Sequence, residues 1–153
     1  MENGKIRDLV ASFDTKDNSV RESAWQQLRE LDEQVVPFFE EFFSRARRLE
    51  ARRDIAFHCI GFARTNETAF RIGLTAIADK SSIVRYRGCC ILAYSLRPEA
   101  VEPLKKLLVH SDTKTVADAT AAIDAIENQN HHLFMDRSHS GRTFWKVCET
   151  DWP

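Results

Sequence analysis

Five side chains that can bind a metal or carry a proton gather near the end of the chain. They are His131, His132, Asp136, His139 and Cys148. Imidazole, carboxylate and thiolate groups are the usual ligands of zinc, but zinc needs three or four of them to converge in space. Their spacing fits no common zinc pattern. We therefore expect no metal site in this segment.

Other residues that could take part in catalysis stand apart from one another. His58 and His110 lie singly within helical patterns. Ser111 and Asp112 follow His110 directly, but a catalytic triad needs convergence in space rather than adjacency in sequence. The sequence also lacks the P-loop, GxGxxG, HExxH and GxSxG motifs. We expect a protein that is not an enzyme and that holds no cofactor.

A basic cluster lies in the stretch "RARRLEARR", at the end of one helical pattern and in the turn after it. Its members are Arg45, Arg47, Arg48, Arg52 and Arg53. Such a cluster can contact a nucleic-acid backbone or an acidic protein, but cations are also favoured at a helix C-terminus, where carbonyls are exposed. Because no aromatic residues are interleaved with the arginines, we favour a solvated turn and keep nucleic-acid binding as an alternative.

Composition favours a single globular domain with no membrane partner. The chain has 153 residues, of which 43% are apolar, and a formal net charge of -1, so it has no overall attraction to nucleic acid or anionic lipid. No apolar run reaches the ~18 residues that cross a bilayer, and "MENGKIRDLV" lacks the apolar centre of a signal peptide. The four cysteines form no CxxC pair, which favours reduced thiols. We expect a cytoplasmic protein.

The elements that must position these residues recur every 32 residues. The anchor positions are Val20, Arg52, Val84 and Val116, and the residues four positions later are Ala24, Ala56, Gly88 and Thr120. The fourth copy fits better when it is moved back by one, to Thr115, Ala119, Ile123 and Ile126. Small and large apolar residues at i, i+4 and i+8 predict one stripe of a helix, with the small residue where another helix approaches closely.

A second amphipathic segment follows each of the first three copies. These segments are 35–43, 67–78 and 98–109, and a similar lone segment, 6–16, precedes the first copy. Each unit is therefore a helical pair, and such pairs must stack because one pair cannot bury its own apolar face. Asp17 and Ser81 can cap helix starts, whereas the helix that begins near residue 49 has no such cap in the sequence.

The stretch "SIVRYRGCCILAYSLRPEAVEPLKKLL" resembles a HEAT repeat, and its "PEAVEPLKKLL" portion is similar to the HEAT-like variety of phycobilisome lyases. The resemblance covers most of residues 1–128 and implies an all-α fold, a right-handed α-solenoid of about seven or eight helices. Two departures are the missing proline kink and Arg52 at an apolar position. Residues 129–153 lie outside the pattern. We expect them to cap the last pair, with 133–136 and 143–147 forming a short β-hairpin.

An arginine follows each of the first three anchors, at Arg21, Arg53 and Arg85. The resemblance implies that these arginines bond carboxylates or carbonyls of the neighbouring repeat, and guanidinium geometry suits such fixed contacts. A basic stripe for phosphate is the alternative. We favour the buried ladder.

The HEAT resemblance also implies a protein partner that binds the concave surface, which the second helices line. By alignment of the repeats, the candidates are Phe39, Glu40, Arg71, Lys105 and Lys106. Their charges pass from acidic to basic, and Phe39 aligns with Lys105 as an exposed anchor. We interpret the chain as a non-catalytic binding module, either an immunity-type inhibitor or an adaptor. The alternatives are a nucleic-acid-binding protein and an enzyme resembling bilin lyases.

Overall fold

The computed structural model describes residues 1–152, and every regular element in that range is helical. The α-helices are α1 (Asn3–Ala11), α2 (Asn18–Leu28), α3 (Val36–Phe43), α4 (Leu49–Cys59), α5 (Glu67–Ala76), α6 (Ser82–Ser95), α7 (Val101–Lys105) and α8 (Thr113–Glu127). Short 3-10 turns extend several of them: η1 (Arg29–Val35), η2 (Ile60–Phe62), η3 (Pro98–Ala100), η4 (Lys106–Val109), η5 (His131–Phe134) and η6 (Glu149–Asp151). Within the described range, no helix is long and apolar enough to cross a membrane.

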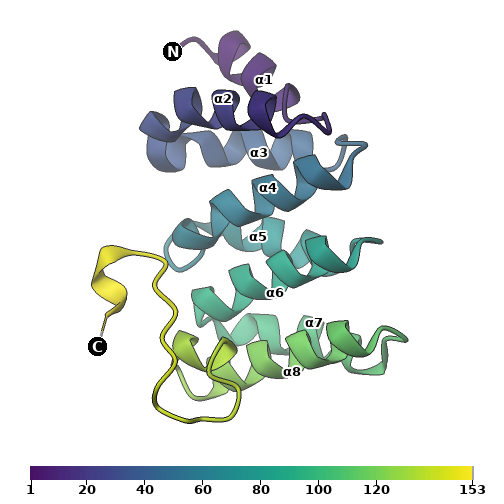
Figure 1. Cartoon of the computed structure of the whole chain (residues 1–153), viewed down its shortest axis with the longest axis vertical. Coiled ribbons are helices and arrows are strands. Elements are labelled where there is room, and N and C mark those ends of the chain that lie inside the picture. The colour runs from purple at the N-terminus through teal and green to yellow at the C-terminus, as the bar shows by residue number, and fades with distance from the viewer. Residues whose placement is uncertain (153) are drawn as a thin grey trace.

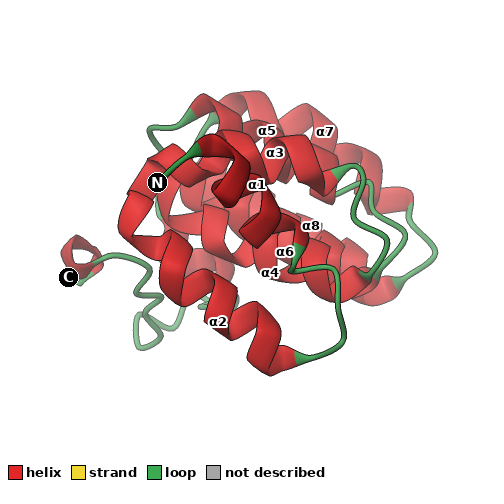
Figure 2. Cartoon of the chain, turned by 90° about the horizontal axis from the view of Figure 1, so that it is seen from above, coloured by secondary structure: helices red, strands yellow, loops and turns green. Residues whose placement is uncertain are grey.

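The helices form two layers that run down the long axis of the molecule (Figure 1). Seen from above, the odd-numbered helices α1, α3, α5 and α7 lie on one side, and the even-numbered helices lie on the other (Figure 2). Across the layers α1 contacts α2, α3 contacts α4, α4 contacts α5, α5 contacts α6 and α7 contacts α8, and within them α1 contacts α3, α3 contacts α5, α4 contacts α6 and α6 contacts α8. The apolar sides of the helices therefore face one another in the interior of the stack.

Burial confirms the predicted helical stripe in α6 and, in part, in α2. In α6 Val84 and Leu92 are buried, and in α2 Ala24 and Leu28 are buried but the predicted anchor Val20 is exposed. In α8 the shifted positions Thr115, Ala119, Ile123 and Ile126 are all buried. Thr120, which the unshifted frame placed inside, is exposed. The one-residue shift of the fourth copy is therefore correct.

The predicted stripe of α4 is buried at Arg52, Ala56 and Ile60, but the arginine predicted for the ladder is one residue out. Ala51, Ile55 and Cys59 are buried as well, so the buried face of α4 is two residues wide. Arg52 takes the place that the sequence pattern gave to Arg53. Arg52 is buried, whereas Arg53 is half-buried and pairs with its neighbour Asp54 at 2.9 Å.

Arg21 on α2 and Arg52 on α4 make the same pair of contacts in successive helical pairs of the stack. Nη1 of each donates to a carbonyl six residues earlier, that of Thr15 at 2.7 Å and that of Ala46 at 3.1 Å. Nε of Arg21 donates to the Asp54 carboxylate at 2.7 Å, and Nε and Nη2 of Arg52 donate to the Asp79 carboxylate at 2.7 and 3.2 Å. Each arginine therefore ties the turn before its own helix to an acid in, or just before, the next even-numbered helix.

Arg85 forms the third contact of this kind. Its Nη1 donates to the Asp79 carbonyl at 2.9 Å, its Nη2 to the Asp112 carboxylate at 3.1 Å, and its Nε to the Thr115 hydroxyl at 2.9 Å. Because all three arginines are buried and bonded inside the stack, they cannot form a stripe for phosphate. The predicted arginine ladder is confirmed, with Arg52 in place of Arg53.

The chain that enters α4 is held by a distant residue. The Asp14 carboxylate, in the turn before α2, accepts from the backbone N–H groups of Arg47 and Arg48 at 3.2 and 2.8 Å. Arg48 is the N-cap residue of α4 and no side chain bonds the first N–H groups of the helix itself, so Asp14 positions the turn before α4 rather than capping it. The predicted local cap of α2 is confirmed, because Asp17 accepts from the Ser19 N–H at 2.9 Å.

Helices α5 and α6 approach each other through two glycines. A Cβ atom added to Gly88 would lie 2.8 Å from the backbone nitrogen of Ile77 and 2.9 Å from the Ala76 Cβ, and one added to Gly73 would lie 2.6 Å from the Ile91 side chain. Gly88 is the residue for which the repeat pattern predicts a close approach. Any larger side chain there must separate the helices.

The C-terminal tail forms no β-hairpin, so that prediction is wrong. Residues 131–134 form the turn η5, and 143–147 have no regular structure. The Asp136 carboxylate accepts from the Ser140 N–H, the Ser140 hydroxyl and the Gly141 N–H at 2.7 to 3.0 Å. The backbone donors of the loop are therefore bonded to a side chain and are not free to pair across strands. Phe134 is fully buried against Tyr86 and Trp145.

We expect Gly88→Ala to lower the free energy of unfolding by about 1–3 kcal/mol, because its methyl group would meet the backbone of Ile77. Gly4 provides the matched control, since it lies in α1 with open space around its added Cβ. Gly4→Ala should stabilise the chain by up to about 1 kcal/mol through helix propensity. Urea unfolding of both variants tests this, and equal effects would contradict the close packing.

A second comparison tests the register of α4. Arg52→Gln should lower the free energy of unfolding by about 3–5 kcal/mol, because it leaves the buried Asp79 carboxylate without its cation. Arg53→Gln should cost less than about 1 kcal/mol, since Asp54 keeps its contact with Arg21. Urea unfolding midpoints would decide between the two registers, and a larger effect of Arg53→Gln would restore the original one.

Candidate functional site

The odd-numbered helices do not present the predicted aromatic anchor. Phe39 is fully buried, so the expectation that it is exposed is wrong. Its ring centroid lies 5.8 Å from that of Phe13 and 6.3 Å from that of Trp25. The α3 segment carries four phenylalanines, and Phe39 is one that turns toward the centre of the stack.

The predicted charges on the same layer are partly neutralised. Glu40 and Arg71 lie together, with Arg71 Nε and Nη2 donating to the two carboxylate oxygens at 2.9 and 3.0 Å. Lys105 approaches Glu102 at 3.4 Å, and Lys106 is exposed. The sequence therefore placed Glu40 and Arg71 correctly on neighbouring helices, but their charges offset each other.

The basic cluster is divided by the fold. Arg52 and Arg53 are bonded to acids of the stack, as described above, and the Arg45 guanidinium lies over the Phe42 ring at 5.6 Å. Arg47 and Arg48 are exposed, while their backbone N–H groups bind Asp14. Five arginines in sequence thus do not make one continuous basic surface.

The histidines of the tail are bonded to different partners. His131 is buried between the Arg64 guanidinium and the Trp145 carbonyl, at 3.2 and 2.9 Å. His132 Nδ1 accepts from the Trp145 N–H at 2.9 Å, and His139 contacts Asp124. Over residues 1–152, no three His, Cys, Asp or Glu side chains gather as metal ligands would.

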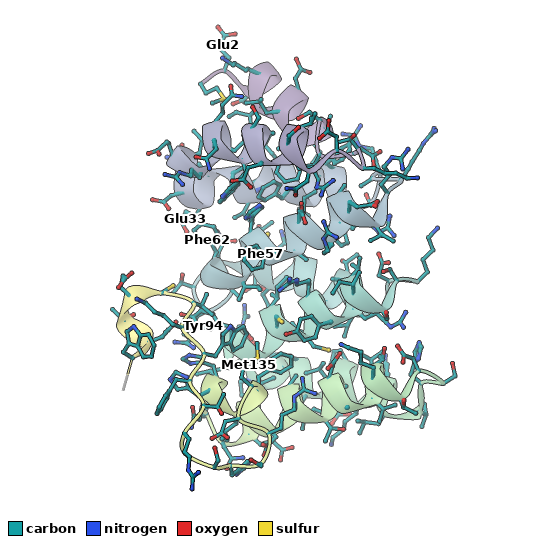
Figure 3. The ribbon with its side chains drawn as sticks, in the orientation of Figure 1. Glu2, Glu33, Phe57, Phe62, Tyr94 and Met135 are labelled. Atoms are coloured by element: carbon teal, nitrogen blue, oxygen red, sulfur yellow. The ribbon has the colours of Figure 1, made fainter. Side chains whose placement is uncertain are left out.

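A pocket of about 470 Å³ opens between the ends of α2 and α4 and the returning tail. Figure 3 labels two of its residues, Phe57 and Phe62, on the side of the stack that the tail approaches. The lining residues are Trp25, Arg29, Asp32, Phe57, His58, Ile60, Gly61, Phe62, Trp145, Lys146, Val147 and Cys148. We call this the aromatic pocket.

The position of the aromatic pocket follows from the first contact of the arginine ladder. Arg21 on α2 binds Asp54 on α4, and the residues one turn further along the two helices are Trp25 and His58. Residues four apart lie on the same face of a helix. The Trp25 and His58 rings are accordingly stacked, with centroids 3.7 Å apart and planes 11° apart. This stack forms the floor of the pocket.

The Trp25–His58 stack is uncharged at physiological pH. Burial lowers the pKa of His58 to about 4, although Asp54 and Glu22 act in the opposite direction. An uncharged imidazole stacked on an indole presents an apolar surface. Phe57, the neighbour of His58, has 51% of its surface exposed at the pocket. The pocket therefore suits an apolar or aromatic group.

The tail wall of the pocket is held by Asp151. Its carboxylate accepts from the N–H groups of Val147 and Cys148 at 2.9 and 2.6 Å and from the Tyr94 hydroxyl at 3.0 Å. Burial opposes ionisation, but these hydrogen bonds hold the pKa of Asp151 below its usual value. A carboxylate near the C-terminus thus fixes Val147 and Cys148 beside Gly61.

Sequence reasoning missed the aromatic pocket, although one signal for it was present. Phe57 stands two positions after Ile55 and two before Cys59, and both of those residues belong to the buried stripe of α4. A large aromatic residue off the buried stripe is left with a partly solvated position. The contribution of Trp145 and Val147 had no local signal, because only the fold brings the tail to α4.

Comparison of the sequence with protein-family models found no match, and comparison with curated proteins found none at a significant level either.

The buried His58 gives a pH-dependent prediction. Between its ordinary pKa of 6.5 and about 4, the unfolded chain binds a proton at this residue that the folded chain does not. Stability should therefore fall as the pH falls through that window. In an NMR titration, the His58 ring resonances should shift with a midpoint near 4. A midpoint near 6.5 would show that the stack with Trp25 does not exclude water.

Proposed function

We propose that this chain is a non-catalytic protein-binding module, built as a short right-handed HEAT-like α-solenoid, whose partner inserts an apolar side chain into the aromatic pocket. The observation that carries the proposal is the half-exposed Phe57 beside a neutral Trp25–His58 stack. Clustered aromatic residues in a concave site are typical anchor points of protein interfaces.

Three features support the HEAT-like architecture. The helices alternate between two layers. The buried stripe returns from Ala51 to Val84 and then to Thr115. Arg21, Arg52 and Arg85 join each even-numbered helix to the next one or to the turn before it. A stack of this kind carries its activity in surface residues, because the core residues are engaged in holding neighbouring units together.

The chemistry of the pocket favours binding over catalysis. His58 lacks the pKa of a general base at neutral pH, and the polar neighbours of the Cys148 thiol include the Gly61 carbonyl, at 4.0 Å, the Asp151 backbone N–H and the Tyr94 hydroxyl. Neither an activated nucleophile nor an acid–base pair lies among the lining residues. An inhibitor that covers another protein, or an adaptor, needs only the shape and apolar surface that are present.

The nucleic-acid alternative has less support from the geometry. It relied on a continuous run of arginines, and the fold leaves Arg45, Arg47 and Arg48 on the surface while Arg52 and Arg53 bind acids. A smaller basic patch supplies fewer phosphate contacts and therefore weaker binding.

Affinity capture from the native host, with Phe57→Ala beside the unchanged chain as bait, tests the proposed site. A partner that binds the aromatic pocket should lose about 2 kcal/mol, or roughly thirtyfold in Kd, when this exposed anchor is removed. The recovered partner is then titrated against both baits. Circular dichroism checks that the variant is folded.

The matched control is the double substitution Lys105→Glu/Lys106→Glu on the odd-numbered layer. We expect it to bind the partner as the unchanged chain does. If the lysine variant loses the partner while Phe57→Ala retains it, the site lies on the odd-numbered helices and the aromatic pocket is not the interface.

A further inference from the structure

Arg87 lies beside the aromatic pocket without an acid to neutralise it. Its guanidinium carbon lies 4.8 Å from the centroid of the Phe57 ring and 5.5 Å from that of Tyr86. Its Nε atom is buried and has no hydrogen-bond partner, and no described carboxylate pairs with the side chain. Arg21, Arg52 and Arg85 are all neutralised within the stack, so Arg87 differs from every arginine of the ladder.

An unpartnered buried donor is unfavourable, because it has lost water without gaining an acceptor. Contact with two aromatic rings also restricts the movement of the Arg87 guanidinium. Such an arginine is prepared for a carboxylate that the chain itself does not supply.

The surroundings of Arg87 carry an excess of positive charge. The Lys114 ammonium also lies 4.5 Å from the centroid of the Tyr86 ring, and it shares Asp118 with Arg137 at 3.2 and 3.1 Å. Three cations on α6, α8 and the tail thus have a single carboxylate among them. We call Phe57, Tyr86, Arg87 and Lys114 the cationic ledge.

We infer that the partner presents an acidic peptide segment, with an apolar side chain in the aromatic pocket and a neighbouring carboxylate on Arg87 of the cationic ledge. This inference rests on the proposed protein-binding function and adds the charge of the partner to it. Phe57 joins the two subsites, because it lines the pocket and its ring lies against the Arg87 guanidinium. The buried Nε is out of reach of a partner, so a carboxylate there would accept from the Nη groups of the same guanidinium in a charge-assisted hydrogen bond.

Short fluorescent peptide pools test the charge preference directly. Three pools share randomised flanks and a fixed Leu, followed by Glu-Glu in the first pool, Gln-Gln in the second and Lys-Lys in the third. Binding is measured by fluorescence polarisation with the full chain. We expect the Glu pool to bind roughly tenfold more tightly than the Gln pool, and the Lys pool to bind least, because hydrogen bonds to charged groups are the stronger ones.

Variants locate the preference on the ledge. Arg87→Gln should reduce the affinity for the Glu pool to that for the Gln pool, and Arg87→Lys should keep part of the difference. Lys106→Gln, which removes one charge from the odd-numbered layer, should leave the preference unchanged. Since the comparison of pools in the unchanged chain needs no substitution, the inference remains testable if an Arg87 variant does not fold.

The outcomes separate this inference from the proposed function. If the Glu pool binds no better than the Gln pool, the acidic partner is excluded, whatever Phe57→Ala does to capture of the native partner. If a single-stranded oligothymidylate displaces the Glu pool and depends on Arg87, the ledge binds phosphate and the peptide inference is overturned. A preference for the Glu pool that survives Arg87→Gln in a folded variant also overturns it.

Discussion

The pairs between buried arginines and aspartates determine how each even-numbered helix of this protein meets the next. Each guanidinium joins three pieces of chain: its own helix, the carbonyl six residues earlier, and an acid in or just before the next even-numbered helix. Because a guanidinium is planar and its donors have fixed directions, these contacts fix the rotation of the helices as well as their spacing. Apolar stripes alone would bring the helices together without selecting one rotation.

The aromatic pocket is a consequence of that constraint. The Arg21–Asp54 pair brings α2 and α4 together at one end, and the next turn of both helices places Trp25 on His58. One turn beyond, the helices are followed by the turns η1 and η2, whose residues line the pocket. The space left between them is closed by Trp145 and Val147 of the tail. A structural contact and a binding surface are thus successive turns of the same pair of helices.

The sequence predicts the periodic part of this structure better than its register. Apolar spacing identifies the helices and the shift at Thr115, and the repeated arginines indicate the ladder. Two adjacent arginines occur in α4, and only the packing of Ala51, Ile55 and Cys59 selects Arg52. The same repeat alignment placed Phe39 on the surface because it cannot distinguish which phenylalanine turns inward.

Non-periodic contacts account for the features that the sequence could not provide. The tail loop follows Asp136 and not the β-propensity of its neighbours, and the turn before α4 is held by Asp14 from another unit. Likewise, the walls of the aromatic pocket come from segments far apart in the chain. Their joint presence is a property of the fold, since no local pattern links Trp25, Phe57 and Val147.

The direction of the arginine ladder has a consequence for how the chain is made on the ribosome. Each arginine is synthesised before the acid that it binds, with separations of 33, 27 and 27 residues. The growing stack therefore always ends in a guanidinium that awaits the next unit. Asp14 has the opposite order, because it emerges before the Arg47 and Arg48 N–H groups that it binds. Each completed helical pair is thus ready to pack against the next helix, but the charge of its arginine is not neutralised until the following pair has been translated.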